Sequence, residues 1–411
     1  MNYTDEFGLT HFHVACMTGC KDLVEKFLEL GQVDPNCCGY ATGDSPLHLA
    51  LLHGRDEVTE LLMRSGANPR STNQNGLTPL HMACKRNLDD KLLEIFFRLS
   101  DELDYTLQVD AVDKLGCTPL HYAVEGRYKS VRALLTRGAD PTLVNKEGLT
   151  PLHIICQRKH YDNLVKLFFE ICDKKHHLVQ VNARDKFDRT PLHYAVANLL
   201  PHAIDELFNR GADLSDFVFP TEAHFAEKLK LAKDEKFFNF KLRLASAALA
   251  VAERLEKNGY ELDQSDAMTI VKLFTKYGLF EKSSNLEKSW YDGEKFKSQA
   301  KEIMIITDLS LYDLIQLRPE EAEKRLALTD YFKLAHSYGL LHKLPRKSIE
   351  ASVLHLCEIL SRRFFRRWSL YPLLELIHYR LPILCCHMII DQLMSEDLYH
   401  ICVAAASQST A

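Results

Sequence analysis

A four-residue motif recurs in the first half of this 411-residue chain and constrains its fold more than any other feature. Four copies read Thr-Pro-Leu-His, a near copy starts at Ser45, and a degenerate copy starts at Thr10. Counted from His13, the intervals between the repeated histidines are 35, 33, 40, 32 and 40 residues. A unit of similar length that occurs six times predicts stacked modules, because one such module cannot bury its apolar face alone. The motif residues of the four full copies are Thr78, Pro79, His81, Thr118, Pro119, His121, Thr150, Pro151, His153, Thr190, Pro191 and His193.

Residues 115–147 show the local sequence signals that one unit contains. Thr118 suits a helix N-cap, since its hydroxyl can accept an unpaired backbone N–H, and Pro119 suits the first helical position, where no N–H is needed. A second helix is expected over residues 128–136, and Gly138 suits its end because glycine tolerates the left-handed conformation. The extra residues of the 40-residue intervals follow the second helix, so we expect longer outer helices or surface loops there, with His177 solvated.

This period and motif resemble the ankyrin family over about residues 5–215. The resemblance implies an all-α ankyrin-repeat solenoid of about six repeats that binds proteins and has no chemistry of its own. It also implies that each motif histidine bonds the threonine hydroxyl and the backbone of the adjoining loop. The histidines lie a full repeat apart, so they do not converge as zinc ligands must.

In ankyrin register, a target protein would lie across the loop tips between units and along the first helices. Exposed Tyr and Met residues suit such a face, although each position could instead be a solvated turn or a packed helix residue. The expected tip residues are Tyr40, Asn73, Gln74, Lys114, Lys146 and Lys186, and those just after the repeated histidines are Met82, Tyr122 and Tyr194.

The composition is that of an ordinary globular protein, with 46% apolar and 26% charged residues. The net charge of −5 gives no general attraction to nucleic acid or to an anionic membrane. No apolar run reaches the roughly 18 residues that span a bilayer, and the first residues lack the features of a secretory signal. The repeats begin almost at the first residue, which leaves no room for a targeting segment. We therefore expect a cytoplasmic protein that can also be nuclear, with no membrane or nucleic-acid partner.

Cofactors, metals and catalysis are not expected either. The 12 cysteines include no Cys-x-x-Cys pair, and several fall at helix-core positions, which is typical of small buried side chains in a reducing compartment. The chain has no glycine-rich phosphate loop, no Gly-x-Ser-x-Gly elbow and no His-Glu-x-x-His helix. We expect no enzyme.

The repeat pattern stops after Leu214, which predicts domains at 1–219, 220–305 and 306–411. In the middle segment we expect two long helices over 221–257, a third over 263–277, and a polar linker over 283–297. This segment would cap the open apolar end of the stack; the alternative is one or two diverged ankyrin units.

The last hundred residues are expected to form a compact helical domain. Pro319 followed by two glutamates favours a helix start, and a long helix is expected over 348–368. Pro372 and Pro382 should interrupt the chain after that helix. The run Arg362–Trp368 alternates arginines with aromatic residues, but helical spacing favours a solvated basic face over a nucleic-acid site.

A second resemblance lies at the C-terminal end. Leu-Pro, an apolar helix, an Asp-Leu pair and a further apolar helix start succeed one another in the order of an F-box core. After ankyrin repeats, such a segment resembles the PRANC family, and residues 309–317, 361–368 and 381–406 are most similar to its insect members. The matching residues are Leu381, Pro382, Ile389, Ile390, Leu393, Asp397 and Leu398.

The PRANC resemblance implies an adaptor. Its F-box-like helices would dock on the Skp-type linker of a cullin-RING (SCF) ubiquitin ligase by helix-in-groove recognition, while the ankyrin face holds the target. The apolar residues of the stripe would fill pockets of the linker, although the same stripe could instead be the core of a small bundle. The alternative functions are a sequestering inhibitor of a signalling protein, such as an NF-κB-type factor, and a plain scaffold.

Overall fold

The computed structural model describes residues 9–31, 33–39, 42–85, 90–126, 128–158, 162–225, 239–280, 291, 293–337 and 339–408. The chain divides into two compact units. Unit 1 comprises Met1–Tyr194 with Asn209–Ala212, and unit 2 comprises Ala195–Phe208 with Asp213–Ala411. The division differs from the three predicted domains: the segments 220–305 and 306–411 belong to one unit, in which helices of the first pack on helices of the second.

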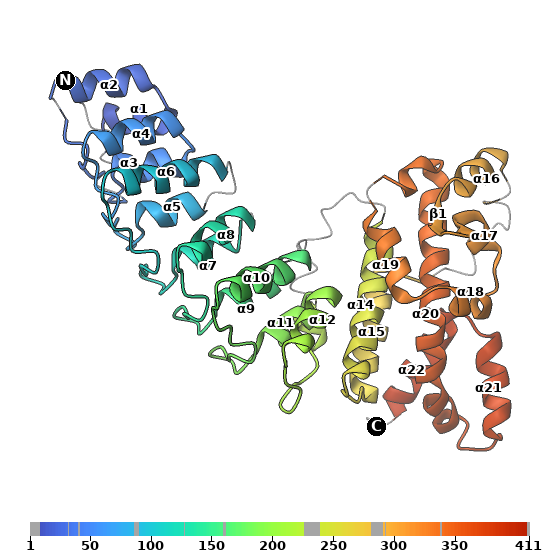
Figure 1. Cartoon of the computed structure of the whole chain (residues 1–411). Coiled ribbons are helices and arrows are strands. Elements are labelled where there is room, and N and C mark those ends of the chain that lie inside the picture. The colour runs from blue at the N-terminus through green and yellow to red at the C-terminus, as the bar shows by residue number, and fades with distance from the viewer. Residues whose placement is uncertain are drawn as a thin grey trace. The chain divides into compact units, whose positions relative to one another are not determined.

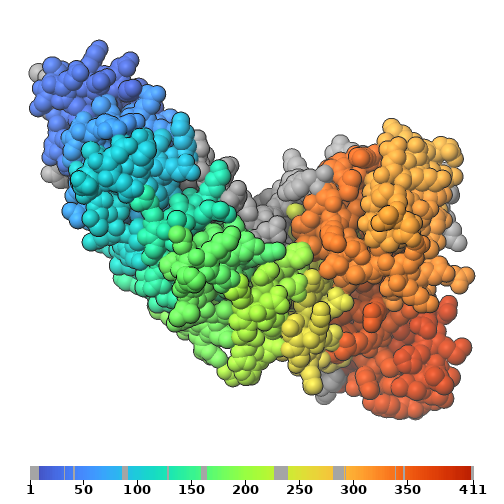
Figure 2. All heavy atoms as spheres, in the orientation of Figure 1, coloured from blue at the N-terminus to red at the C-terminus, as the bar shows by residue number. Residues whose placement is uncertain are grey.

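Unit 1 is a stack of antiparallel helix pairs joined by loops that project from one edge of the stack (Figure 1). Figure 2 shows the successive repeats side by side in sequence order, from blue to teal. The pairs are α1 (His11–Thr18) with α2 (Lys21–Glu29), α3 (Pro46–Leu52) with α4 (Asp56–Arg64), α5 (Pro79–Lys85) with α6 (Asp90–Glu102), α7 (Pro119–Ala123) with α8 (Tyr128–Thr136), and α9 (Pro151–Cys156) with α10 (Asp162–Lys174). In the sixth pair, α11 (Pro191–Ala197) crosses the boundary between the units and α12 (Pro201–Asn209) lies mostly in unit 2.

The expected lengthening of the outer helices is confirmed. Helices α6 and α10 belong to the two 40-residue units and have 13 residues each, whereas α4 and α8 have nine. The turn after α10 differs in one detail from the expectation, because His177 is not simply solvated. Its Nε2 lies 3.2 Å from the carbonyl oxygen of Leu135 at the end of α8, so the insertion also joins neighbouring repeats.

Unit 2 is built around one long helix, α20 (Arg346–Leu376). Packed on it are α14 (Phe240–Lys257), α15 (Gln264–Lys276), α17 (Leu311–Gln316), α18 (Pro319–Arg325), α19 (Leu328–His336), α21 (Ile383–Gln392) and α22 (Ser395–Gln408). The remaining elements are α16 (Glu294–Lys301), a short antiparallel pair β1 (Met304–Ile306) and β2 (Leu309–Ser310), and the 3₁₀ turn Leu341–Lys343.

The core of unit 2 joins these helices through aromatic contacts. Phe365 of α20 is fully buried, with its ring centroid 5.4 Å from that of Phe274 in α15 and 5.3 Å from that of Phe280. The Phe280 ring also contacts Tyr399 of α22 at 5.8 Å. Residues from the middle segment and from the last helix therefore share one core.

Helix α20 continues through Pro372, which was expected to interrupt it. A proline has no N–H to donate to the carbonyl four residues earlier, which is that of Trp368. The thiol of Cys402 in α22 lies 3.6 Å from this oxygen and replaces the missing donor. The donor comes from a residue 30 positions further along the chain than Pro372.

The middle segment is helical as predicted where the structure describes it, with two corrections. The expected linker 283–297 ends in a helix, because α16 begins at Glu294; residues 283–290 and 292 lie outside the described part. Thr221 repeats the motif geometry, with its hydroxyl 3.0 Å from Nδ1 of His224, which begins a helix over 222–225. This seventh (Thr/Ser)-x-x-His pair was not predicted, and it favours the alternative of a diverged ankyrin unit.

Candidate protein-binding surfaces

The motif histidines hold each loop against the next helix pair. In the unit that starts at Thr118, the threonine N–H donates to Nδ1 of His121 at 3.1 Å, so Nδ1 is an acceptor. The proton then resides on Nε2, which donates to the carbonyl of Leu149 in the following loop at 3.0 Å. Burial lowers the pKa of His121 and keeps the ring neutral. The same bond to the next loop is made by His13, His48, His81 and His153.

The loop tips form a continuous backbone ladder. The N–H groups of Lys114, Lys146 and Lys186 donate to carbonyls of Asn75, Leu115 and Glu147, respectively, at 2.8–3.0 Å. Gln74 makes the corresponding bond to Thr42. The tips are thus held at fixed positions along the edge of the stack, which suits a preformed binding surface.

One Asn or Asp residue closes each of four successive loops, and three of these four residues are buried. Asp113 accepts backbone N–H bonds from Leu115 and Cys117 at 2.8 Å each. Asn73, Asn145 and Asp185 make the same pair of bonds in their loops. Asn73 was expected at a tip, but it is 7% exposed, because its side chain holds the loop together.

The two tyrosines that follow a motif histidine are bonded to these aspartates. The hydroxyl of Tyr122 donates to Asp113 at 2.6 Å, and that of Tyr194 donates to Asp185 at 2.5 Å. Each ring also meets the motif histidine of the preceding unit edge-on, with centroids 5.8 Å apart. Where the loop carries asparagine instead, the corresponding helix residue is Met82 or Ile154, which has no hydroxyl.

This alternation reveals a double repeat that the sequence interpretation missed. Thr78 and Thr150 are 72 residues apart, as are Thr118 and Thr190. Two outer-face contacts recur at nearly the same spacing. Arg137 pairs with Asp101 and stacks on Phe97, and Arg210 pairs with Asp173 and stacks on Phe169. The alternating intervals of 40, 32 and 40 residues were the signal that could have revealed it.

The predicted ankyrin-face residues therefore fall into three groups. Gln74, Lys114, Lys146 and Lys186 are exposed at the tips. Tyr122 is half-buried, while Asn73, Met82 and Tyr194 are at most 7% exposed and belong to the repeat core. Tyr40 lies outside the described residues. The accessible part of the predicted face is thus its loop tips.

The second surface is the outer side of α21. Pro382 is the N-cap of this helix, and Cys386 and Ile390 face the core of unit 2. The remaining large side chains lie in solvent, with exposed fractions of 40% for Leu381, 50% for Ile383, 72% for Leu384, 69% for Met388 and 40% for Ile389. We call these five residues the α21 patch.

The other predicted F-box-like residues are divided between core and surface. Ile390 and Leu398 are at most 1% exposed, so they stabilise the domain itself, and Leu393 is half-buried. Asp397 is exposed, and its carboxylate accepts the Met394 N–H at 3.1 Å at the start of α22. Only part of the predicted stripe can therefore reach a partner.

The arginine run of α20 is only in part the expected solvated basic face, because Arg363 and Arg367 are exposed whereas Arg362 and Arg366 are half-buried. Arg366 pairs with Glu320 of α18 at 2.5 Å and with Asp391 of α21 at 3.5 Å. Arg362 donates to the backbone oxygen of Asp391 at 2.9 Å, and Arg367 pairs with Glu256 of α14 at 2.7 Å. These arginines hold three neighbouring helices against α20.

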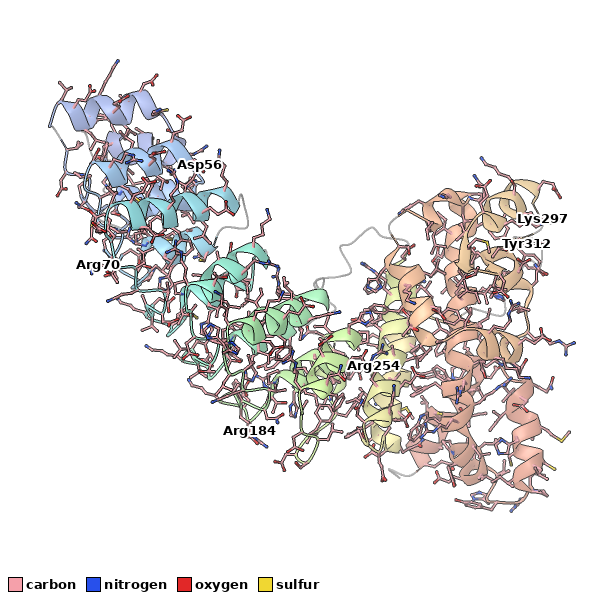
Figure 3. The ribbon with its side chains drawn as sticks, in the orientation of Figure 1. Asp56, Arg70, Arg184, Arg254, Lys297 and Tyr312 are labelled. Atoms are coloured by element: carbon pink, nitrogen blue, oxygen red, sulfur yellow. The ribbon has the colours of Figure 1, made fainter. Side chains whose placement is uncertain are left out.

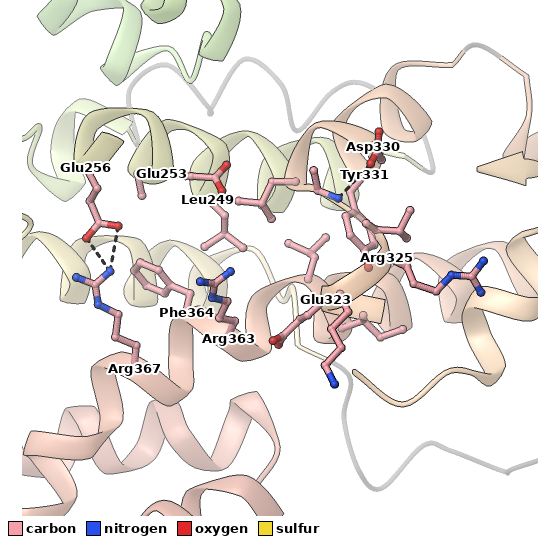
Figure 4. A pocket seen from close by; sticks show the side chains of 17 residues that line it. Leu249, Glu253, Glu256, Glu323, Arg325, Asp330, Tyr331, Arg363, Phe364 and Arg367 are labelled. Atoms are coloured by element: carbon pink, nitrogen blue, oxygen red, sulfur yellow. Dashed lines mark hydrogen bonds and ion pairs between the residues drawn. The ribbon is translucent and has the colours of Figure 1, made fainter. Parts of the chain in front are cut away.

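A pocket of about 590 Å³ lies between α14, α20 and the α18–α19 segment (Figure 4). Leu249, Leu326 and Leu360 form part of its apolar lining. Four carboxylates and four cations line the pocket, so it favours neither an anionic nor a cationic ligand. These residues are Glu253, Glu256, Glu323, Asp330, Lys324, Arg325, Arg363 and Arg367.

Within the described residues, no cluster of three or more His, Cys, Asp or Glu side chains could hold a metal ion. None of the described helices combines the length and the apolar character needed to cross a bilayer. The thiols of Cys16, Cys84 and Cys357 are buried, and burial raises the pKa of each.

A family model described as ankyrin repeats in three copies matches residues 1–73, 57–145 and 131–217, which together cover more than half of the chain. The chain therefore belongs to the ankyrin-repeat family, whose fold is a scaffold for protein–protein interaction.

Relatives share the repeats at modest identity. The chain is 32% identical over 177 residues to transient receptor potential cation channel subfamily A member 1 of Drosophila melanogaster, covering 42% of this chain and 14% of the channel. It is 29% identical over 213 residues to the B-cell lymphoma 3 protein homolog of Mus musculus, covering 51% and 45%. It is 26% identical over 205 residues to ankyrin repeat protein OPG189 of Variola virus, covering 42% and 35%.

Among solved structures, the ankyrin repeat domain of Bcl-3 matches 51% of this chain and 89% of its own, at 29% identity and a TM-score of 0.42. The chain spans less than half the length of each of these three curated relatives.

Proposed function

We propose that this chain is a non-enzymatic adaptor of the PRANC type. Its ankyrin loop tips bind a target protein, and its α21 patch docks on the Skp-type linker of a cullin-RING ubiquitin ligase. The observation that carries the second half is the exposure of five large apolar side chains on and just before one helix. Clusters of this kind mark interaction sites, because their contact with water is unfavourable in an isolated protein.

The chemistry of α21 supports a helix that enters an apolar groove. Leu384 and Met388 are one turn apart and are the most exposed members of the patch. Arg362 and Arg366 of α20 both contact Asp391 near the C-terminal end of α21, so the helix is presented in a fixed orientation. A preformed helix loses little conformational entropy on binding, which favours affinity.

Co-purification with a Skp-type linker and its cullin tests the adaptor role. Leu384→Glu with Met388→Glu places two charges in the patch without touching the core, and we expect at least tenfold weaker recovery. Gln392→Glu with His400→Glu adds the same charges at exposed positions outside the patch and should leave recovery unchanged. Failure of the wild-type chain to bind any Skp-type linker would overturn the proposal.

A second candidate is a sequestering inhibitor of a signalling protein, such as an NF-κB-type factor. The similarity of 213 residues to the B-cell lymphoma 3 protein homolog favours it, since Bcl-3 is described as a member of the IκB protein family. Deleting 306–411 would not separate the two candidates, because α14 packs on α19 and α20 and would lose its core. The Leu384→Glu, Met388→Glu variant separates them. An inhibitor should still block its target in this variant, whereas an adaptor should lose its effect on the target.

A further inference from the structure

The chemical class of the target can be inferred from the loop tips, an inference that rests on the proposed function. Lys114, Lys146 and Lys186 occupy the same position in three successive loops, and we call them the lysine ridge. The backbone ladder fixes their spacing, and all three side chains are exposed. Among the described residues, no carboxylate pairs with Lys114 or Lys146, while Lys186 lies 3.4 Å from Glu147 in an exposed contact.

Several carboxylates of these loops already have partners. Glu147 contacts Lys186, and Asp188 pairs with Arg184 at 2.6 Å. Asp113 and Asp185 point inward and close their loops, each with an exposed fraction of 7%. Arg70 and Arg184 lie at the loop edge of the stack as well (Figure 3). The cations of the lysine ridge thus stand in solvent, whereas Asp113 and Asp185 are buried below them.

Large apolar side chains stand beside the lysines. Leu115 follows Lys114 and is 63% exposed, and Phe187 follows Lys186 and is 67% exposed. They occupy equivalent places in the double repeat, 72 residues apart. Val112 and Val144 add exposed fractions of 59% and 53%. Cations next to exposed apolar groups favour a partner that offers carboxylates and apolar side chains together.

We propose that the lysine ridge binds an extended acidic segment of a partner protein. Its carboxylates would pair with Lys114, Lys146 and Lys186, and its apolar side chains would pack on the two equivalent anchors, Leu115 and Phe187. A segment that runs along the tips meets the same lysine and anchor twice, so two copies of one short acidic–apolar motif fit this surface. Cooperation between the two contacts raises affinity without any new type of interaction.

Selection of random peptides displayed on phage against the full chain tests this proposal without a known target. We expect enrichment of Asp or Glu together with Leu, Ile, Phe or Trp. The enriched peptide is then synthesised with a fluorophore, and its binding is measured by anisotropy. Lys114→Glu, Lys146→Glu and Lys186→Glu combined should weaken binding roughly tenfold or more. Lys166→Glu, Lys174→Glu and Lys175→Glu combined, on exposed positions of α10 and its end, make the same charge change and should alter it less than about twofold.

Two further measurements sharpen the result. Raising the salt concentration to about 1 M should remove most of the difference between the two triple variants, because exposed charges are then screened. Leu115→Ser and Phe187→Ser should each weaken binding by a similar factor if the anchors are equivalent.

The outcomes separate this inference from the proposed function. Enriched peptides without acidic residues, or equal binding by both triple variants, would overturn the acidic class while leaving a protein-binding face. Tighter binding of a single-stranded oligonucleotide than of any peptide to the same lysines would overturn both the acidic class and the protein target. Absence of any enriched peptide would also count against both.

Discussion

Asp185 offers the sharpest test of how the loops are held. Its side chain is 1% exposed and accepts five hydrogen bonds. Two come from the backbone of Phe187 and Arg189, two come from the Arg189 guanidinium at 2.9 and 3.0 Å, and one comes from the Tyr194 hydroxyl. Asp113 makes the same backbone and tyrosine bonds, but Cys117 stands where Arg189 would be. The two loops therefore form a matched pair that differs by one guanidinium.

Asp185→Asn keeps an acceptor for the backbone but places an amide N–H₂ against the donors of Arg189 and Tyr194. Loss of charge-assisted bonds at a buried site costs about 2–4 kcal/mol of unfolding free energy. Asp113→Asn loses only the tyrosine bond and its charge, so we expect about 1–2 kcal/mol. Denaturant unfolding measures both values, and hydrogen exchange of the Phe187 and Arg189 amides reports the loop directly.

The pH dependence gives an independent check. Burial raises the pKa of Asp185, but the bonds from Tyr194 and Arg189 and the backbone N–H groups outweigh it, so the pKa is lowered overall. In the unfolded chain, the aspartate side chain has a pKa of about 3.9. The stabilisation is therefore complete above about pH 5 and is lost as the pH falls through the lower folded pKa. Equal costs for Asp185→Asn and Asp113→Asn, or a cost for Asp185→Asn that does not shrink between about pH 5 and pH 3, would refute the reasoning.

Three other perturbations have defined outcomes. Gly116→Ala should cost about 2–3 kcal/mol of unfolding free energy, because the new Cβ would lie 2.9 Å from the backbone nitrogen of Lys146. Gly138 also has a positive φ but faces open space, so Gly138→Ala should cost about 1 kcal/mol. Comparable unfolding midpoints for the two variants would contradict this. Burial lowers the pKa of the motif histidines. The free energy of unfolding should therefore fall as the pH drops from about 6.5 to about 5, by as much as about 1.4 kcal/mol per pH unit for each ring. A thermal midpoint that stays constant over this range would contradict the prediction. Glu358→Ala should cost about 2–4 kcal/mol of unfolding free energy, because Glu358 is 3% exposed and its carboxylate accepts the Ser395 N–H and hydroxyl at the start of α22. Glu358→Gln keeps an acceptor and should cost less. Calorimetric unfolding compares the two variants.

The features that were predictable from the sequence act over a few residues along the chain. Threonine caps, prolines at the first helical position and glycines at helix ends are local signals, so the six repeats and the helix ends near Gly259 and Gly278 could be predicted. The insertion lengths likewise predicted the long outer helices. The same local signals indicated the ankyrin family.

Packing between distant segments controls which predicted site residues can meet a partner. Met82 and Tyr194 were expected at the binding face, yet neighbouring repeats bury them, and Ile390 and Leu398 are held in the core of unit 2 in the same way. Conversely, α21 packs on its unit through Cys386 and Ile390, which leaves its other large apolar side chains in solvent. Helix α20 continues through Pro372, where a cysteine of α22 supplies a donor to the carbonyl that the proline leaves unpaired. Each of these outcomes depends on residues far apart in sequence, which periodicity and local propensity do not encode.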